Sequence, residues 1–240
     1  MLQLNYLLGY ENLKIYQDDE MFKFSLDSVL LPNFVTLSNK KSKILDIGTG
    51  NAVIPLILTT KTKNSIDAVE IQKEVYELAQ KTIEYNKVQH QITLYNMDIK
   101  EYAKNLESDI YDTITCNPPF FKTNMVSNKL ESKTIARHEK TLNLEDIITI
   151  SKKLLKNNGN IAIVHRTERL IDIIDIMKKN NIEPKKIQFV YPNKNKLSNI
   201  LLIEGTKNGK PGVKILEPIY LHNNDGSYTE QLKEYLNTSV

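Results

Sequence analysis

Four consecutive residues, Asn117-Pro118-Pro119-Phe120, follow a β-branched run and have the most specific chemistry in the sequence. The Asn117 amide oxygen and the Pro118 carbonyl are two acceptors for one exocyclic amino group, and Pro119 stiffens the turn that presents them. Phe120 supplies a face on which a planar base can stack. An amine held through both N–H groups has its lone pair directed at an electrophile, which predicts catalysis by orientation. A proline-rich surface turn is the structural alternative, but such turns seldom carry a second phenylalanine such as Phe121.

A glycine turn lies earlier in the chain, in the stretch DIGTGNAV from Asp46 to Val53. Gly48 and Gly50 allow a tight turn close to a ligand, with backbone amides at a helix N-terminus facing it. The dinucleotide fingerprint is incomplete, because Val53 stands where the third glycine belongs. A bare strand-to-helix turn is therefore the alternative to a binding loop.

Acidic residues follow the glycine turn at the ends of two further predicted strands. Glu70 lies about 20 residues beyond the glycines, where a carboxylate can accept hydrogen bonds from both ribose hydroxyls. Asp98 is placed to accept from an adenine amino group. The alternatives are an exposed acid at a helix N-terminus for Glu70 and helix capping for Asp98. With Asp46, three acids at successive strand ends indicate the ligand crevice of an open α/β sheet.

The elements that must position these residues alternate along the chain. Strands are predicted at 43–48, 65–70, 92–96, 111–116, 160–166, 185–192 and 199–207. Helices are predicted at 52–60, 73–87, 143–159, 170–182 and 228–236. The pattern predicts a Rossmann-like, doubly wound α/β fold with a seven-stranded, mostly parallel sheet and helices on both faces. The connection before the last strand is too short for a crossover helix, so that strand is antiparallel.

Details of three segments complete this prediction. Ser25 suits the N-cap of a helix and Asp27 its first turn. Asn143 suits the N-cap of a later helix that Gly159 ends. The polar, aperiodic stretch between Phe121 and this second helix is predicted to be a long loop.

Composition excludes several classes of protein. The chain has 240 residues, a formal charge of +3 and one cysteine, Cys116, so it has no internal disulfide and that thiol is expected to be a buried small hydrophobe. The four histidines are scattered and offer no metal-ligand spacing. No basic residue precedes Lys14 and no apolar run approaches the ~18 residues of a membrane helix. These features favour a cytoplasmic protein without a metal or a membrane anchor.

Taken together, the motifs resemble those of the class I S-adenosylmethionine-dependent methyltransferases that modify amino groups. The resemblance implies that DIGTG is the cofactor loop, with Ala52 at its last glycine position, and that the NPPF motif holds the amine. The implied cofactor-binding residues are Asp27, Asp46, Gly48, Gly50, Glu70, Ile71, Asp98 and Asn117. The implied catalytic residues are Asn117, Pro118, Pro119 and Phe120.

Two further stretches narrow the resemblance. MFKFSLDSVLLPNF (21–34) and ARHE (136–139), together with NPPFF, are similar to the bacterial tRNA(Val) N6-methyltransferases over nearly the whole chain. This similarity implies direct in-line methylation of an anticodon-loop adenine, with Phe24 and Asp27 near the cofactor. We therefore expect one domain, with residues 1–42 covering the cofactor site, 43–207 forming the catalytic core and 208–240 extending it.

Local charge suggests where RNA binds. Residues 178–196 carry six lysines against one glutamate, with aromatic residues between them. The candidate RNA-binding residues are Arg137, His138, Lys185, Lys186, Lys194 and Lys196. A solvated lysine-rich face is the alternative. The rival functions are guanine-N2 methylation of rRNA and a nonenzymatic nucleotide- or RNA-binding module on the same fold.

Overall fold

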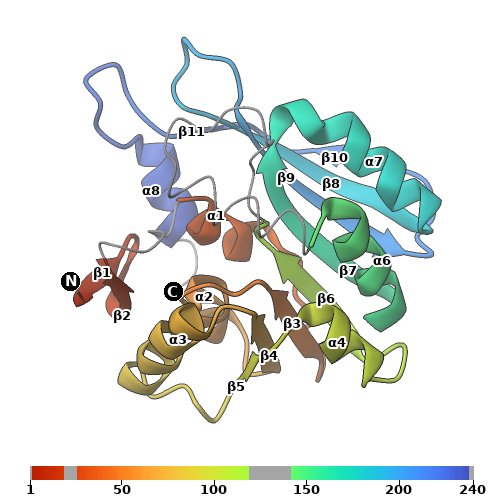
Figure 1. The fold of residues 1–240 in the computed structure, drawn as a ribbon. Coiled ribbons are helices and arrows are strands. Elements are labelled where there is room, and N and C mark those ends of the chain that lie inside the picture. The colour runs from red at the N-terminus through yellow and green to blue at the C-terminus, as the bar shows by residue number, and fades with distance from the viewer. Residues whose placement is uncertain (1, 19–25, 119–141, 238–240) are drawn as a thin grey trace, which may run out of the picture.

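Strands and helices alternate along the chain and build one mixed sheet with helices on both faces (Figure 1). The computed structural model describes residues 2–18, 26–118 and 142–237. The strands of the sheet are β3 (Lys43–Ile47), β4 (Ser65–Glu70), β5 (Ile92–Asn96), β6 (Tyr111–Cys116), β7 (Leu155–Arg166), β8 (Ile182–Tyr191), β9 (Ile200–Lys207), β10 (Lys214–Ile215) and β11 (Ile219–Tyr220). The helices are α1 (Asp27–Phe34), α2 (Val53–Lys61), α3 (Lys73–Tyr85), α4 (Ile99–Lys104), α6 (Leu144–Leu154), the 3-10 turn η1 (Thr167–Arg169), α7 (Leu170–Lys179) and α8 (Glu230–Asn237).

The strand order is β10-β8-β9-β7-β6-β3-β4-β5, with β11 beside β8. Strands β3 to β7 pair in parallel, whereas β9 runs antiparallel to both β7 and β8. The predicted seven-stranded sheet with an antiparallel last strand is therefore confirmed. The strands β10 and β11 add to it along β8 and were not predicted, because two residues are too few to form a periodic pattern.

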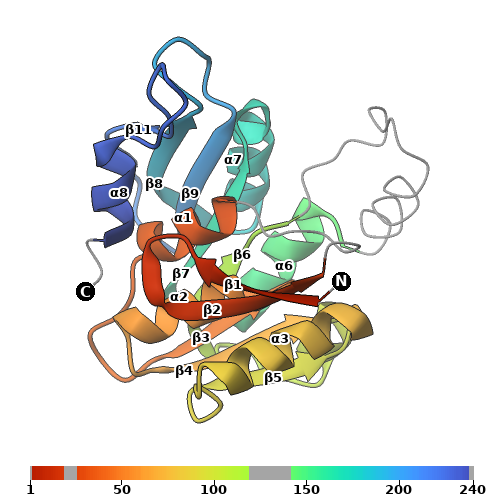
Figure 2. The ribbon, with the colours of Figure 1, turned by 90° about the vertical axis from the view of Figure 1, so that its left-hand side faces the viewer.

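Alternation along the strands divides the core into two clusters, one on each face of the sheet. Ile44 packs in the cluster that α1, α2, α3 and α8 cover, and the next residue, Leu45, packs in the cluster that α4, α6 and α7 cover. Figure 1 shows α1, α2, α3 and α8 on one side of the sheet and α4, α6 and α7 on the other, and Figure 2 looks at the first of these sides. Burial on both faces explains why the parallel strands are almost continuously apolar.

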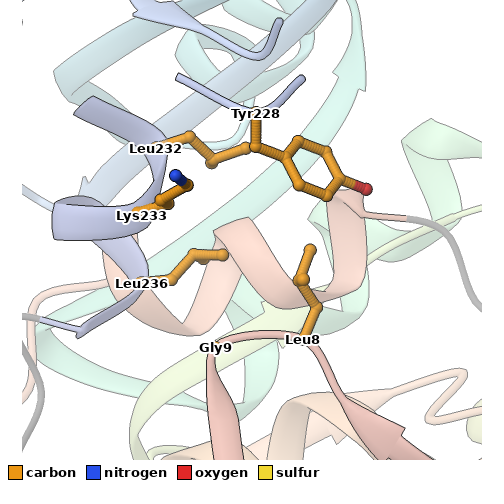
Figure 3. A pocket seen from close by; sticks show the side chains of 6 residues that line it. All are labelled: Leu8, Gly9, Tyr228, Leu232, Lys233 and Leu236. Carbon is orange, nitrogen blue, oxygen red and sulfur yellow. The ribbon is translucent and has the colours of Figure 1, made fainter. Parts of the chain in front are cut away.

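The N-terminal residues form a hairpin that is not among the predicted elements, with strands β1 (Leu2–Leu7) and β2 (Tyr10–Asp18). Its turn lies directly against α8, because a Cβ on Gly9 would be 2.7 Å from Leu236 Cβ. A small pocket of about 70 Å³ lies between them, lined by Leu8 and Gly9 of the turn and by residues of the C-terminal segment (Figure 3). The predicted C-terminal helix is confirmed, and it packs into the core through Leu232 and Leu236.

The helix α6 begins as predicted and ends earlier than predicted. Asn143 and Asp146 form a reciprocal capping box at its start. The helix ends at Leu154, not at Gly159, because the chain turns directly into β7 at Leu155. A Cβ on Gly159 would lie 3.0 Å from the backbone oxygens of Asp112 and Lys156, so this glycine permits close packing inside a strand and does not end a helix.

Two expected absences and the expected burial of Cys116 can be compared with the described part of the chain. None of its helices is both long enough and apolar enough to cross a membrane. Within residues 2–18, 26–118 and 142–237, no group of three or more His, Cys, Asp and Glu side chains is arranged to hold a metal ion. Cys116 is buried at the end of β6, as predicted, and burial raises the pKa of its thiol.

Candidate active site

The parallel strands β3, β4, β5 and β6 end at one edge of the sheet, here called the carboxyl edge. Register brings the candidate residues together there. Ile47 pairs with Cys116, so Gly48 and Asn117, which follow them, leave neighbouring strands side by side. The NPPF motif therefore begins beside the glycine turn, at the point where open α/β sheets bind ligands.

The glycine turn has the conformation that its sequence predicts. Gly48 and Gly50 have φ angles of 65° and 57°, which favour glycine, and no atom lies within 4 Å of a Cβ built on either. The amides of Gly48 and Thr49 donate to the Val69 carbonyl at 3.0 and 3.1 Å. Ala52 also has a positive φ, 65°, a left-handed conformation that favours glycine. The open space above both glycines can admit a ligand.

Glu70 ties this turn to the end of β4. The side chain is 4% exposed, and its two oxygens accept from the amides of Gly50 at 3.0 Å and Gln72 at 2.9 Å. The next residue, Ile71, is 41% exposed and places an apolar side chain at the same corner. Asn96, which was not among the candidates, donates to the Glu70 and Ile71 carbonyls and fixes the corner from β5. A carboxylate has about four acceptor sites, so Glu70 retains acceptor capacity for a ligand.

Asp46 is completely buried in β3 and only partly hydrogen-bonded. Its Oδ1 accepts from the Thr115 hydroxyl at 2.6 Å, whereas Oδ2 has no hydrogen-bond partner among the described residues. The Thr49 hydroxyl is also buried and lies close enough to Asp46 to favour its charged form, but it makes no hydrogen bond of normal geometry with the described residues. Burial raises the pKa of the Asp46 carboxyl to about 7. These unsatisfied polar atoms under the glycine turn fit a site completed by a polar ligand.

Asp98 caps α4, which is the structural role considered for it. Its Oδ1 accepts from the Lys100 amide at 2.7 Å, and the residue is half-buried just beyond β5. This contact occupies one carboxylate oxygen. The Met97 amide donates to the Glu70 carbonyl at 3.1 Å, which holds the ends of β4 and β5 together. Asp98 and Glu70 consequently lie on neighbouring strand ends.

Asn117 is half-buried after β6, and its amide nitrogen donates to the Ser28 hydroxyl of α1 at 2.8 Å. Pro118 is buried beside it. Asp27 is the first residue of α1 and precedes Ser28, so the segment that was expected to cover the cofactor does reach the NPPF motif. Candidates Pro119, Phe120, Arg137 and His138, together with Phe24, lie outside the described residues.

The four candidate lysines do not form one patch. Lys194 and Lys196 are exposed in the loop between β8 and β9, which lies at the carboxyl edge because β8 runs parallel to β7. Lys185 lies within β8 and donates to the Lys210 carbonyl at 3.0 Å. Lys186 is also inside β8.

The ammonium group of Lys186 is engaged by the segment that follows α1. It donates to the Phe34 carbonyl at 2.5 Å and the Thr36 hydroxyl at 2.9 Å, and lies 3.5 Å from Glu204 Oε1. Burial lowers the pKa of Lys186. These contacts make Lys186 a structural cation inside the fold.

Sequence reasoning missed residues that support the site through long-range contacts. Ser28 is 89 positions from Asn117, and Asn51, at the glycine turn, donates to the Tyr16 carbonyl of β2 at 2.9 Å. The hydroxyl of Thr115 in β6 donates to Asp46 in the neighbouring strand β3. Periodicity predicts which face a side chain occupies, but it cannot pair side chains that are tens of residues apart.

Comparison with known proteins shows the family of the chain. Residues 25–180 match the family model described as "Methyltransferase small domain". The chain is 31% identical to the tRNA1(Val) (adenine(37)-N6)-methyltransferase of Parabacteroides distasonis, over 81% of each chain. It is 26% identical to the protein of the same name from Flavobacterium psychrophilum, over 88% of this chain and 91% of the relative.

A solved structure shows the same fold at lower sequence identity. Atu636 from Agrobacterium tumefaciens, described as a predicted O-methyltransferase, superposes with a TM-score of 0.70 at 17% identity, covering 89% of this chain and 96% of that one. This match shows that the two proteins share a fold. The chain belongs to the tRNA1(Val) (adenine(37)-N6)-methyltransferase family of S-adenosylmethionine-dependent enzymes.

Proposed function

We propose that this enzyme methylates N6 of adenine 37, beside the anticodon of tRNA1(Val), and that Asn117 and the Pro118 carbonyl orient the reacting amine. The observation that supports this most is the register of β3 and β6, which sets Asn117 beside the glycine turn. The names of the relatives support the substrate. An anticodon-loop adenine is already single-stranded, so placing it in the site costs less than extracting a base from a duplex.

The described residues fit S-adenosylmethionine. The open space over Gly48 and Gly50 admits the cofactor against the backbone, and Asp46 offers its unpaired buried oxygen below the turn. Glu70 has acceptor capacity for the ribose hydroxyls, and the Asp98 oxygen that does not cap α4 can accept from the adenine amino group. Ile71, exposed between these two acids, supplies an apolar surface for the adenine ring.

Methyl transfer to the amine depends on how the protein orients the reactants more than on general acid or base catalysis. Bound S-adenosylmethionine supplies an electrophilic methyl group on a sulfonium. Asn117 Oδ1 and the Pro118 carbonyl accept the two N–H groups of the adenine amine, which directs the nitrogen lone pair along the line of attack. Phe120 stacks on the base, and Pro119 fixes the turn. The surplus proton of the methylated amine leaves to water, so no side chain forms a covalent bond.

RNA reaches this edge through the neighbouring loops. Lys194 and Lys196 are exposed at the carboxyl edge and are suited to contact phosphates, as are Arg137 and His138 in the segment before α6. Lys185 and Lys186 were candidates for the same role. Their contacts within the fold favour Lys194 and Lys196.

Nucleoside mass spectrometry tests the substrate. Total RNA from a strain that lacks this gene is incubated with the enzyme and labelled S-adenosylmethionine, then digested to nucleosides. We expect label in N6-methyladenosine and its loss when tRNA is removed from the RNA. Label in N2-methylguanosine would favour the rival assignment, guanine-N2 methylation of rRNA. Binding of S-adenosylmethionine without transfer to any RNA would contradict both assignments.

A further inference from the structure

One contact at the site is not used by the mechanism above, namely the hydrogen bond between Asn117 and Ser28. Asn117 Nδ2 donates to Ser28 Oγ at 2.8 Å, and both residues are half-buried. It is the one hydrogen bond that the Asn117 side chain makes with the described residues. The remaining amide atom, Oδ1, is not the one bound to Ser28 and accepts no hydrogen bond from the described part of the chain.

An asparagine amide can present either its oxygen or its nitrogen to a ligand, and the two choices have opposite consequences for an amine. An oxygen accepts an amine N–H, whereas an NH2 group would set donor against donor. In this structure the Ser28 hydroxyl accepts from Nδ2, so the contact holds the amide plane in place and leaves Oδ1 for the reacting amine.

Ser28 itself is held firmly enough to act as an anchor. It lies in the first turn of α1, and the following residues Val29, Leu30 and Leu31 are completely buried in the core. The far end of α1 is fixed by the Lys186 ammonium, which bonds the Phe34 carbonyl. A hydroxyl on a fixed helix constrains its partner, whereas a hydroxyl on a mobile loop would not.

We propose that Ser28 is a positioning residue for methyl transfer, which acts by fixing the Asn117 amide with Oδ1 toward the adenine amine. This inference rests on the proposed role of Asn117. Ser28 touches Asn117 and is not assigned a contact with the reacting atoms. Its loss should consequently lower turnover while leaving the affinities for S-adenosylmethionine and tRNA unchanged.

Substitutions at Ser28 give a matched set. Ser28→Ala removes the hydroxyl and retains good helix propensity. Ser28→Thr keeps the hydroxyl on a β-branched side chain, and Ser28→Val has the shape of threonine without the hydroxyl. Ser38→Ala, in the exposed segment after α1, removes a serine hydroxyl whose one hydrogen bond among the described residues is from the Lys40 amide. It controls for the loss of a hydroxyl far from the site.

Single-turnover rates at saturating S-adenosylmethionine and tRNA are measured for each variant and for wild type. We expect Ser28→Ala and Ser28→Val to react about 3- to 10-fold more slowly, the loss for one neutral hydrogen bond. Ser28→Thr should recover most of the rate, and Ser38→Ala should match wild type. Equal rates for Ser28→Thr and Ser28→Val, or a wild-type rate for Ser28→Ala, would overturn the proposal.

A double-mutant cycle separates this inference from the function on which it rests. In an Asn117→Ala background, Ser28→Ala should cause no further loss, because there is no amide left to orient. A full additional loss would show that Ser28 acts independently of Asn117, which contradicts the inference alone. Wild-type turnover by Asn117→Ala itself would instead contradict the proposed role of Asn117.

Discussion

Buried carboxylates occur in two regions of this protein and differ in how completely they are hydrogen-bonded. Away from the site, Glu204 accepts from the Thr36 amide at 2.6 Å, the Thr36 hydroxyl at 2.7 Å and the Asn160 amide at 3.0 Å. The Lys186 ammonium lies 3.5 Å away. Each oxygen of Glu204 is therefore satisfied within the protein.

A second structural carboxylate, Asp67, has three partners, all on one oxygen. Its Oδ2 accepts from the hydroxyls of Tyr102 at 3.0 Å and Tyr111 at 2.5 Å, and pairs with Lys43 at 2.7 Å. At the carboxyl edge, the completely buried Asp46 has one hydrogen bond of normal geometry, from Thr115 to Oδ1, and its Oδ2 has none among the described residues. Buried polar groups are normally satisfied by the fold. This difference is expected if Glu204 and Asp67 stabilise the protein and a ligand completes the surroundings of Asp46.

The largest predicted effect on turnover is at Asn117, whose Oδ1 likewise has no hydrogen-bond partner among the described residues. Asn117→Ala should lower turnover by roughly two to three orders of magnitude, the scale of losing a preorganised polar contact in a transition state. Methyl transfer to tRNA at saturating substrates measures this loss. Isothermal titration with S-adenosylmethionine and thermal unfolding should stay close to wild type. Turnover within twofold of wild type would remove Asn117 from the mechanism.

A saturated carboxylate should behave in the opposite way. Glu204→Ala leaves the largely buried Lys186 ammonium without its anion and should lower the free energy of unfolding by about 3 kcal/mol. Urea denaturation measures this change. Glu204→Gln, which keeps one acceptor oxygen, should cost less. At a temperature where both proteins are folded, the variant should retain wild-type turnover, and a selective loss of turnover would contradict the division into two classes.

Glu70 tests an intermediate case, because each of its oxygens already accepts one backbone amide. Glu70→Ala should weaken S-adenosylmethionine binding by about 1.5 to 3 kcal/mol, the range for hydrogen bonds to a charged group. Titration calorimetry measures the affinity for the cofactor, and affinity for tRNA serves as the control. If the variant binds S-adenosylmethionine as tightly as wild type, Glu70 belongs with the structural carboxylates.

The raised pKa of Asp46 gives a prediction about pH. Burial raises the pKa of its carboxyl from an ordinary value near 3.8 to about 7, so between these values the folded state binds more protons than the unfolded state. Stability then falls as pH rises through that window. From pH 6 to 8 the loss should be about 1.4 kcal/mol in the unliganded protein.

Asp46→Asn isolates this effect, since the amide cannot ionise. Urea denaturation at pH 6, 7 and 8 should show wild type losing stability relative to the variant as pH rises. The opposite slope would mean that an unseen cation compensates the buried charge. A flat difference would show that the Asp46 carboxyl titrates near its ordinary value.

The sheet and its carboxyl edge were predictable because they follow from short-range patterns. β-Branched runs and glycine turns fixed seven strands, and parallel order then placed the ends carrying Gly48, Glu70 and Asn117 side by side. The contact of Ser28 with Asn117 was missed because it joins residues 89 positions apart, which no local pattern encodes. The β1–β2 hairpin was also missed, although it is local and turns at Leu8 and Gly9.

Charge density was the least informative pattern, since it ignores where a strand points its side chains. Lys186 and Lys194 fall in the same basic stretch of sequence. Lys186 is in a strand whose side chains alternate into the fold, so its ammonium is turned toward Glu204 and the end of α1. Lys194 is in a loop and is exposed. Among the lysines, as among the carboxylates, the structure thus distinguishes a side chain bonded within the fold from one that is available to a ligand.

The last and smallest prediction concerns these exposed lysines. If Lys194 and Lys196 neutralise phosphates, replacing both with glutamine should flatten the slope of log affinity for tRNA against log salt by roughly 0.7 to 0.9 per lost contact. A matched control is Lys41→Gln with Lys63→Gln, which removes the same charge from exposed positions just before β3 and β4, at the opposite edge of the sheet. Binding is measured between about 50 and 200 mM salt, where phosphate contacts change the affinity most clearly. Only a local contact distinguishes the two edges of the sheet. If the slope of the Lys194 and Lys196 variant is unchanged from wild type, or if the control changes it equally, this loop does not bind the RNA.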